Sequence, residues 1–378
     1  MSVGQRSRRI DLIRGVSILL VLFHHFNIAY RLDETLLARA FGWEAVRAVA
    51  RNGNYGVTMF FVVSGFLITT NAKHRWAGLS NIQPSAFYGF RVARIIPCLL
   101  LLLAIVNVLA LAGVAIFQNH PQEDGQLSFW LVNFAALTFW TNVLIAHVGW
   151  ANYPLGVLWS LSVEEVFYLS FPVLCLALRS DARLIVFWAV VIVVGPVYRL
   201  FHQGDEAGFL FAYLASFDGI AIGCCTALLA HRLSLRGRKS RLLQVAVVVA
   251  MAVLYLCQPI AETNTLGVTA MALGTAVLLA TDHQRLAEPF PKSTWLAAPL
   301  CWFGRLSYEL YLFHLVVLGA MRTLAPPRTT HSDSRLLLLA AYFVASAALS
   351  LAVARFYSEP LNQSIRRHLA GRPSKAVA

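Results

Sequence analysis

The sequence predicts an all-α fold, a polytopic transmembrane helical bundle with about ten spans and with its N- and C-termini in the cytoplasm. Of the 378 residues, 58% are hydrophobic and only 13% are charged, whereas a soluble domain is usually about a quarter charged. The mean hydropathy is +0.65. Apolar runs of about 20 residues, the length that crosses a bilayer, recur along the chain.

Eleven apolar stretches are long enough to be considered as spans. They cover residues 11–30, 55–72, 90–117, 127–147, 156–178, 183–201, 208–231, 241–258, 264–281, 300–321 and 335–358. Residues 1–378 are therefore expected to form a single membrane domain. Its core is expected over residues 9–360, and residues 361–378 are expected to form a short basic cytoplasmic tail.

The distribution of Lys and Arg tests whether all of these stretches cross the membrane. Three arginines within the first nine residues favour a cytoplasmic N-terminus. If 127–147 and 156–178 both cross, the basic segment at 231–241 falls outside, whereas it falls inside if 127–147 does not cross. We therefore expect ten spans and a long external excursion at 118–155, with its aromatic-rich part half-inserted at the interface. Eleven crossings are the alternative.

Composition also excludes several classes of protein. The net charge of +13 is explained by basic residues at loop ends, and no basic soluble domain is present to bind nucleic acid. The six cysteines lie in or beside apolar runs without metal-ligand spacing, so they are predicted to be packing residues. No metal site and no tightly bound cofactor are expected.

The first apolar stretch carries ionisable residues that lipid does not favour. Arg14 and His25 are eleven residues apart, close to three helical turns, so they share a face about 16 Å apart along the axis. Asp11 lies three residues before Arg14, which is a contact spacing. His24 points about 100° away from His25. The alternative is that Arg14 reaches the cytoplasmic surface and His25 is a hydrogen-bonded core residue.

Two further clusters combine charge with aromatic residues. Arg91 and Arg94 lie one turn apart at a predicted cytoplasmic helix entry, where they serve as an anchor or bind phosphate groups. Glu164 lies four residues before Tyr168 and four after Ser160, so the three share a face, and the adjacent Glu165 points elsewhere. Acids inside a membrane span usually pair or have a function.

A fourth cluster lies in the segment GRLSYELYLFH. Ser307, Tyr311 and His314 have the spacing of one helical face and form a polar stripe. An aromatic core stripe with hydrogen-bonded hydroxyl groups is the alternative to a functional role.

Taken together, the clusters resemble the acyltransferase-3 family of membrane O-acyltransferases, over Arg9 to about Pro360. The matching motifs are Arg14 and His25 with ten residues between them, Ser64–Gly65–Phe66, Arg91 and Arg94, Trp159 through Tyr168, and Ser307 through His314. The Trp159–Tyr168 motif selects Glu164 over Glu165.

This resemblance implies an enzyme of the bacterial cytoplasmic membrane, surrounded by membrane lipids. It would transfer an acyl group, expected to be acetyl, from cytoplasmic acyl-CoA to a hydroxyl of a carbohydrate or lipid-linked glycan. Many family members carry an additional SGNH hydrolase-like domain. None is expected here, so the membrane domain is expected to complete the transfer itself.

On this reading His25 is the general base, because an imidazole titrates near neutral pH. Glu164 is the carboxylate expected to orient it, although other carboxylates remain open, and Arg14 links the base to the donor side. Substrate contacts are expected from Arg91, Arg94, Asp11, Ser64, Trp159, Tyr168, Ser307, Tyr308, Tyr311 and His314. The alternatives are a proton-coupled secondary transporter, because buried acids and histidines also build proton relays, and a polysaccharide exporter or scaffold with an acyltransferase-like fold.

Overall fold

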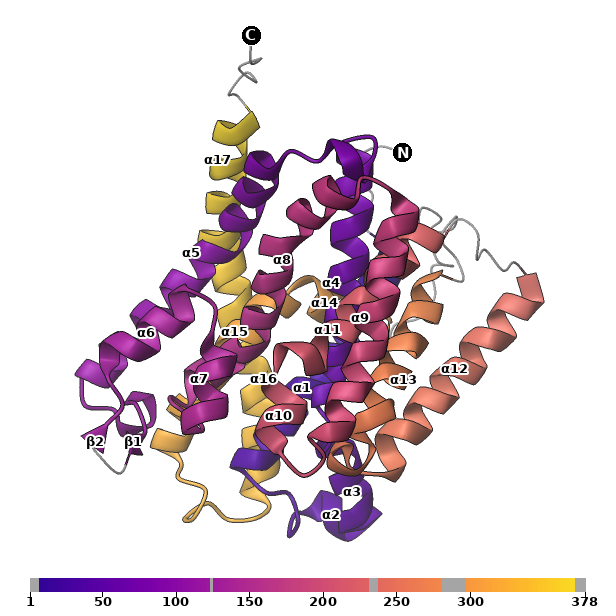
Figure 1. Cartoon of the computed structure of the whole chain (residues 1–378). Helices are drawn as coiled ribbons and strands as arrows, with labels where there is room; N and C mark the ends of the chain where they lie inside the picture. Colours follow the sequence, from indigo (N-terminus) through magenta and orange to yellow (C-terminus); the bar gives the residue numbers. More distant parts are fainter. Residues whose placement is uncertain (1–6, 123–124, 231–236, 281–296, 371–378) are drawn as a thin grey trace.

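The computed structural model describes residues 7–122, 125–230, 237–280 and 297–370, which form a helical bundle (Figure 1). Within these residues, nine helical segments are long and apolar enough to cross a membrane. A further helix, α15 (Ser307–Leu324), is 18 residues long and is mostly buried in the bundle. The predicted all-α membrane bundle of about ten spans is therefore confirmed.

The helices follow the apolar stretches. In the first part of the chain they are α1 (Arg8–Ala29), α2 (Leu36–Phe41), α3 (Trp43–Ala50), α4 (Asn54–Arg75), α5 (Pro84–Leu111), α6 (Phe129–Leu137), α7 (Thr141–Val148) and α8 (Leu158–Leu178). They continue as α9 (Asp181–Phe201), α10 (Glu206–Phe211), α11 (Tyr213–Leu229), α12 (Gly237–Cys257), α13 (Ile260–Ala280), α14 (Ala297–Arg305), α15, α16 (Ser334–Val353) and α17 (Glu359–Ala370).

Short irregular elements connect these helices. The 3₁₀ segments are Leu79–Asn81, Ala115–Phe117 and Pro154–Val157, and the π-helical turn Ala354–Ser358 joins α16 to α17. In the described part of the chain, sheet structure is limited to one antiparallel pair of two-residue strands, β1 (Pro121–Gln122) and β2 (Gly125–Gln126).

The segment 127–147 does not form a spanning helix. It contains α6 and α7, which have nine and eight residues. Each rises only about 13 Å, against a hydrocarbon core of about 30 Å. The break between them includes Phe139, whose φ of 61° does not continue a right-handed helix. Trp130 is 77% exposed, as expected of an aromatic residue at the membrane interface. The expectation that this segment does not cross is therefore supported by its structure.

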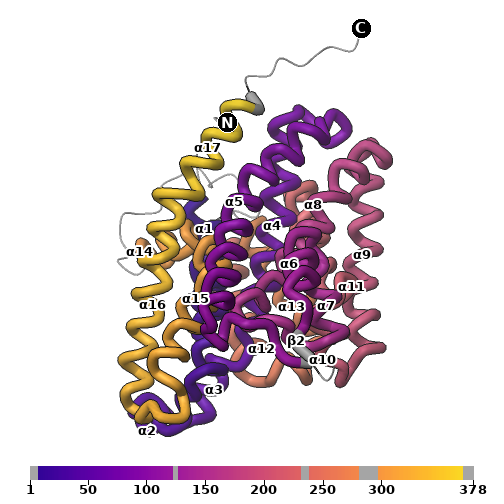
Figure 2. The backbone as a smooth tube through the Cα atoms, turned by 90° about the vertical axis from the view of Figure 1, so that its left-hand side faces the viewer, coloured from indigo at the N-terminus to yellow at the C-terminus, as the bar shows by residue number. Residues whose placement is uncertain are grey.

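The start of α1 and the end of α17 lie at the same end of the bundle (Figures 1 and 2). This arrangement fits an even number of crossings. Of the tail expected at 361–378, residues 361–370 belong to α17, whereas residues 371–378 lie outside the described part. Residues 231–236 of the basic segment at 231–241 also lie outside it.

Glycines allow two helix pairs to approach until their backbones touch. A Cβ atom added at Gly65 in α4 would overlap the carbonyl oxygen of Ile220 in α11, and one at Gly223 would overlap that of Val62. The pair α1–α14 is built in the same way, since a Cβ at Gly304 would overlap the carbonyl oxygen of Asp11. Small residues at such crossings are typical of membrane helices, which associate by close packing rather than by water exclusion.

A buried ion pair connects α9, α11 and α13. Arg199 donates two hydrogen bonds to Asp218, at 2.7 and 3.2 Å, and both side chains are 0% exposed. Arg199 also donates to Thr269 at 2.6 Å, and the Thr269 hydroxyl is 2.6 Å from the same carboxylate. Further bonds from Arg199 reach the backbone carbonyls of Ala215 and Thr265. The intramembrane acid Asp218 is thus paired, as a charge in this position must be.

Removing only one partner of this pair should destabilise the fold. In Arg199→Met, Asp218 stays buried without its counter-charge, so we expect a loss of about 3–5 kcal/mol in the free energy of unfolding. The double variant Arg199→Met/Asp218→Leu should recover much of that loss, because it leaves no lone charge behind. Thermal unfolding in detergent measures both effects. A double variant no more stable than Arg199→Met would contradict this account.

The orientation of the bundle can be tested with α12. The basic segment at 231–241 predicts that Gly237, at the start of α12, is cytoplasmic. Cys257 ends the same helix and is exposed. A membrane-impermeant thiol reagent should therefore label native Cys257 in intact cells. In a Cys257→Ser background, Gly237→Cys should be labelled only after the membrane is permeabilised. Immediate labelling of Gly237→Cys would reverse the orientation.

Candidate active site

The polar faces predicted for the first span and for the fourth cluster meet in the structure. The Nε atom of Arg14 on α1 donates to Ser307 Oγ on α15 at 3.0 Å. Further along the same pair of helices, the imidazoles of His25 and His314 face each other, with centroids 5.0 Å apart and planes at 62°. The two helices therefore share contacts at two levels of the bundle.

The two adjacent histidines of α1 face different surroundings. The Nδ1 atom of His24 lies 2.7 Å from the carbonyl oxygen of Ala50 at the end of α3, and its Cβ packs against Gly53. His25 instead contacts His314 on α15. Arg14 and His25 both contact α15, in agreement with the shared face of the first helix that their spacing of three turns predicted.

The tautomers of the facing histidines follow from their backbone contacts. His25 Nδ1 lies 2.9 Å from the carbonyl oxygen of Val21, and His314 Nδ1 lies 3.0 and 2.8 Å from those of Leu310 and Tyr311. A carbonyl oxygen only accepts, so each Nδ1 carries the hydrogen and each neutral ring keeps its lone pair on Nε2. His314 Nε2 is buried and has no hydrogen-bond partner within the described residues. Two basic nitrogens are therefore available here.

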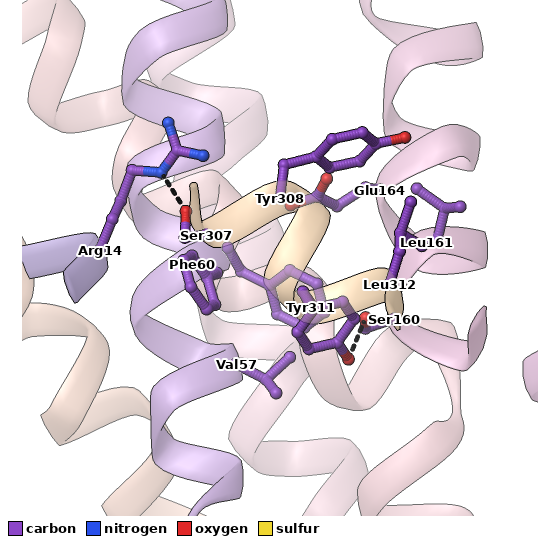
Figure 3. A pocket seen from close by; sticks show the side chains of 11 residues that line it. Arg14, Val57, Phe60, Ser160, Leu161, Glu164, Ser307, Tyr308, Tyr311 and Leu312 are labelled. Carbon is purple, nitrogen blue, oxygen red and sulfur yellow. Dashed lines mark hydrogen bonds between the residues drawn. The ribbon is translucent and has the colours of Figure 1, made fainter. Parts of the chain in front are cut away.

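A cavity of about 100 Å³ opens between α1, α4, α8 and α15 (Figure 3). Its polar lining consists of Arg14, Ser160, Glu164, Ser307, Tyr308 and Tyr311, and its apolar lining consists of Val57, Phe60, Phe61, Leu161 and Leu312. Across the cavity, the Tyr311 hydroxyl and Ser160 Oγ lie 2.7 Å apart. Most polar residues of the third and fourth clusters thus meet the first cluster at one site.

Glu164 is held by a chain of hydroxyl groups. Tyr168 donates to Glu164 Oε2 at 3.0 Å, and Ser64 Oγ lies 2.8 Å from the Tyr168 hydroxyl oxygen. Because the Tyr168 hydroxyl has one hydrogen, Ser64 donates to Tyr168 and Tyr168 donates to Glu164. Ser64 therefore links α4 to α8, while the next residue, Gly65, allows α4 to approach α11. The motif Ser64–Gly65–Phe66 therefore contributes both to the contact of α4 with α8 and to its contact with α11.

The structure does not bring the expected partner Glu164 to His25. In the described part of the chain, no hydrogen bond or ion pair joins them, and the ring beside His25 is that of His314. The reason is their different levels in the bundle. Glu164 shares the cavity with Arg14, whereas His25 lies about 16 Å further along α1. The adjacent Glu165 is also buried, and its Oε1 has no partner among the described residues.

Arg91 and Arg94 project from α5 toward aromatic residues of this site. The Arg91 guanidinium lies 5.5 Å from the centroid of the Tyr168 ring. Arg94 lies 4.7 Å from the centroid of the Tyr308 ring and 3.9 Å from a carboxylate oxygen of Glu309. The predicted phosphate-binding residues are therefore continuous, through Tyr168 and Tyr308, with the lining of the cavity.

Two predicted binding residues lie in tightly packed regions. Trp159 is 7% exposed and packs edge-on against Phe61 and Phe211, at centroid distances of 6.2 and 5.3 Å. Asp11 is 5% exposed, and its backbone touches Gly304 on α14. Neither residue lines the cavity.

Some residues at the site were not predicted as site residues. Ser160 was recognised only through its spacing to Glu164, and it lines the cavity opposite Tyr311. Glu309 accepts a hydrogen bond from Ser358 at 2.9 Å and lies beside Arg94. The apolar lining residues have no distinctive sequence signal. The described residues include no group of acidic, His and Cys side chains that could hold a metal ion.

Comparisons with known proteins point to one family. A family model described as an acyltransferase domain matches residues 7–355. The chain is similar to the peptidoglycan O-acetyltransferase OatA of Listeria monocytogenes, with 25% identity over 330 residues, which cover 82% of this chain and 49% of that protein. Similar relatives occur in Bacillus subtilis (25% identity, 82% and 48% coverage) and Staphylococcus aureus (23%, 82% and 50%). The Bacillus protein is provisionally named a peptidoglycan O-acetyltransferase, and the Staphylococcus protein is provisionally named an O-acetyltransferase.

This chain therefore spans about half the length of these curated relatives. No solved structure matches it.

The hydroxyl chain to Glu164 predicts a specific loss of stability. Tyr168→Phe would remove two partly buried hydrogen bonds, one to the Glu164 carboxylate and one from Ser64, which costs about 1–3 kcal/mol in total. The melting temperature in detergent should fall accordingly. Tyr88→Phe is the matched control, because the Tyr88 hydroxyl donates to the Leu169 carbonyl at an exposed position. Equal melting temperatures for the two variants would contradict the contribution of Tyr168.

Proposed function

The chain belongs to this acyltransferase family, and we propose that it transfers an acetyl group from cytoplasmic acetyl-CoA to a hydroxyl group of a glycan of the peptidoglycan type. The observation that carries the proposal is the pair His25–His314, whose free Nε2 atoms lie on the same two helices as Arg14 and Ser307. The histidine pair offers a proton acceptor for the acceptor hydroxyl, and Arg14, at another level of the bundle, offers a cationic contact for the donor.

The proposed reaction begins with the acceptor hydroxyl. His25 Nε2 takes its proton while the oxygen attacks the thioester carbonyl carbon of the donor, because a neutral alcohol reacts slowly with a thioester. The new C–O bond forms, the C–S bond breaks, and the coenzyme A thiolate leaves. The imidazolium then returns the proton to that thiolate, so the products are the acetylated hydroxyl and the free thiol.

His314 is proposed to support His25 in place of a carboxylate. Its own Nδ1–H is fixed by backbone carbonyls, and its buried Nε2 has no other partner in the part of the chain that the structure describes. It can therefore accept a hydrogen bond from the protonated Nε2 of His25 and stabilise the imidazolium, while the Val21 carbonyl oxygen, which accepts from the Nδ1–H of His25, orients the ring as the third residue of a catalytic triad does. In this proposal Glu164 lines the cavity and does not orient the general base.

The donor is proposed to enter from the end of the bundle where Arg91 and Arg94 lie. Guanidinium groups suit phosphate oxygens because their N–H groups form a planar fork. Arg14 lines the cavity, at a different level of α1 from His25, and would contact the donor there. Family membership favours this acyl transfer over proton-coupled transport. The acceptor class is proposed from the relatives, whose names specify peptidoglycan.

The proposed function can be tested with purified protein. The assay combines acetyl-CoA labelled in its acetyl group with soluble peptidoglycan fragments and follows the label into alkali-sensitive esters. We expect transfer that depends on both substrates. Absence of transfer, together with acetyl-CoA-independent passage of protons or glycans across reconstituted membranes, would favour a transporter.

The catalytic base gives a second test. His25→Ala should lower kcat by about 100- to 10,000-fold, the usual contribution of general base catalysis. Its affinity for acetyl-CoA should be retained, because the proposed donor contacts lie at another level of the bundle. His24→Ala is the matched control, since His24 contacts the end of α3 instead of α15.

Both variants need comparable amounts of inserted protein and comparable melting temperatures for this comparison. A larger loss of kcat in His24→Ala than in His25→Ala would refute the assignment. His314→Ala should also lower kcat without changing acetyl-CoA affinity, and an unaffected rate would remove His314 from the proposed mechanism.

A further inference from the structure

Helix α17 brings a basic residue to the helix that carries Arg91 and Arg94. It continues α16 through the π-helical turn and packs beside α5 at the end of the bundle where α1 begins (Figures 1 and 2). Arg366 is partly buried in this region, whereas the adjacent Arg367 is exposed and lines a separate groove with Arg355 and Glu359. Two consecutive arginines therefore have different surroundings.

The side chains of three helices converge around Phe90 of α5. The guanidinium of Arg75, at the end of α4, lies 4.1 Å from the centroid of the Phe90 ring, and that of Arg366 lies 5.5 Å from it. Arg366 also interacts electrostatically with Arg91, Arg75 and Arg94. We call Arg75, Arg91, Arg94 and Arg366 the arginine cluster.

Carboxylates lie near only two members of the arginine cluster. Arg94 lies 3.9 Å from Glu309, and Arg91 interacts electrostatically with Glu164 and Glu165. Arg75 and Arg366 form no ion pair with a carboxylate among the residues that the structure describes. The Nε atoms of Arg91 and Arg366 are buried without a hydrogen-bond partner among the residues that the structure describes. Like charges at this spacing repel each other and disfavour the arrangement unless an anion neutralises them. The cluster therefore has the charge and the free donors of a site for a multiply charged anion.

The arginine cluster lies next to the candidate cavity. Arg91 lies over Tyr168, which holds Glu164 at the cavity, and Arg94 lies over Tyr308, which lines the cavity. An anion bound by the cluster is thus next to the route that leads to Arg14. Arg367, by contrast, lines the separate groove on the exposed side of α17.

We propose that Arg366 and Arg75 complete, with Arg91 and Arg94, a binding site for the phosphate groups of a nucleotide-bearing acyl donor. This inference rests on the proposed acetyl-CoA-dependent function and extends it to α17 and to the end of α4. Several guanidinium groups can each contact phosphate oxygens, and a donor with both a pyrophosphate and a separate phosphate monoester can satisfy more than one of them at once. Helix α17 is then part of the donor site.

The test uses the full chain in nanodiscs of zwitterionic lipid and measures the Kd for acetyl-CoA and for dephospho-acetyl-CoA, which lacks the ribose phosphate. Arg366→Gln and Arg75→Gln should each raise the Kd for acetyl-CoA about 10- to 100-fold, as expected for a lost charged hydrogen bond. At least one of them should bind the two donors with more similar affinities than the parent does. Arg366→Lys should restore only part of the affinity, because an ammonium cannot make a bidentate contact.

Arg367→Gln is the matched control and should retain the parental Kd. Unchanged acetyl-CoA affinity in both Arg366→Gln and Arg75→Gln would overturn the inference. The inference would also be overturned if the two variants lost affinity for acetyl-CoA only in nanodiscs that contain phosphatidylglycerol. The cluster would then bind a lipid phosphate. If the parent protein itself binds no acetyl-CoA, the proposed function fails, and that outcome is distinct from a failure of Arg366 or Arg75 alone.

Discussion

Polar side chains inside this bundle must find their partners on neighbouring helices, because lipid offers them none. The contacts described above follow this constraint. Arg199 and Asp218 join α9 to α11, Tyr168 joins Ser64 on α4 to Glu164 on α8, and Arg14 joins α1 to Ser307 on α15. Each bond satisfies a polar group and also fixes the relative position of two helices. The same side chains that define the candidate site therefore determine how the bundle is assembled.

Much of the fold could be predicted because its rules are local. Apolar length predicts spans, and charge at loop ends favoured a non-crossing segment at 127–147, where the structure has two short helices and no candidate span. The angular argument for His24 and His25 was equally local, and the structure shows these side chains facing different helices. The break between α6 and α7 was not predicted, because the left-handed backbone at Phe139 has no clear sequence signal.

The candidate site was only partly predictable, because it depends on how distant helices are aligned. The sequence indicated which residues share a face of α1, α8 or α15, but not which level of one helix meets which level of another. For this reason Glu164 was expected beside His25, whereas the structure places it beside Tyr168 and at the cavity with Arg14. Arg366 was assigned to a tail because nothing in the residues of α17 themselves indicates that this helix packs against α5.

The close contact between α1 and α14 has a consequence for the size of the donor. Arg14 and His25 lie on one continuous helix, so the distance between them along its axis stays near 16 Å. The backbone contact between Gly304 and Asp11 prevents α1 from sliding along α14, so both residues also keep their level in the bundle. If phosphate groups bind beyond Arg14, the reactive carbonyl must extend from them on a long and flexible arm. Coenzyme A has such an arm in its pantetheine, whereas acetyl phosphate does not. A rigid first helix would thus act as a molecular ruler that accepts long donors and rejects short ones.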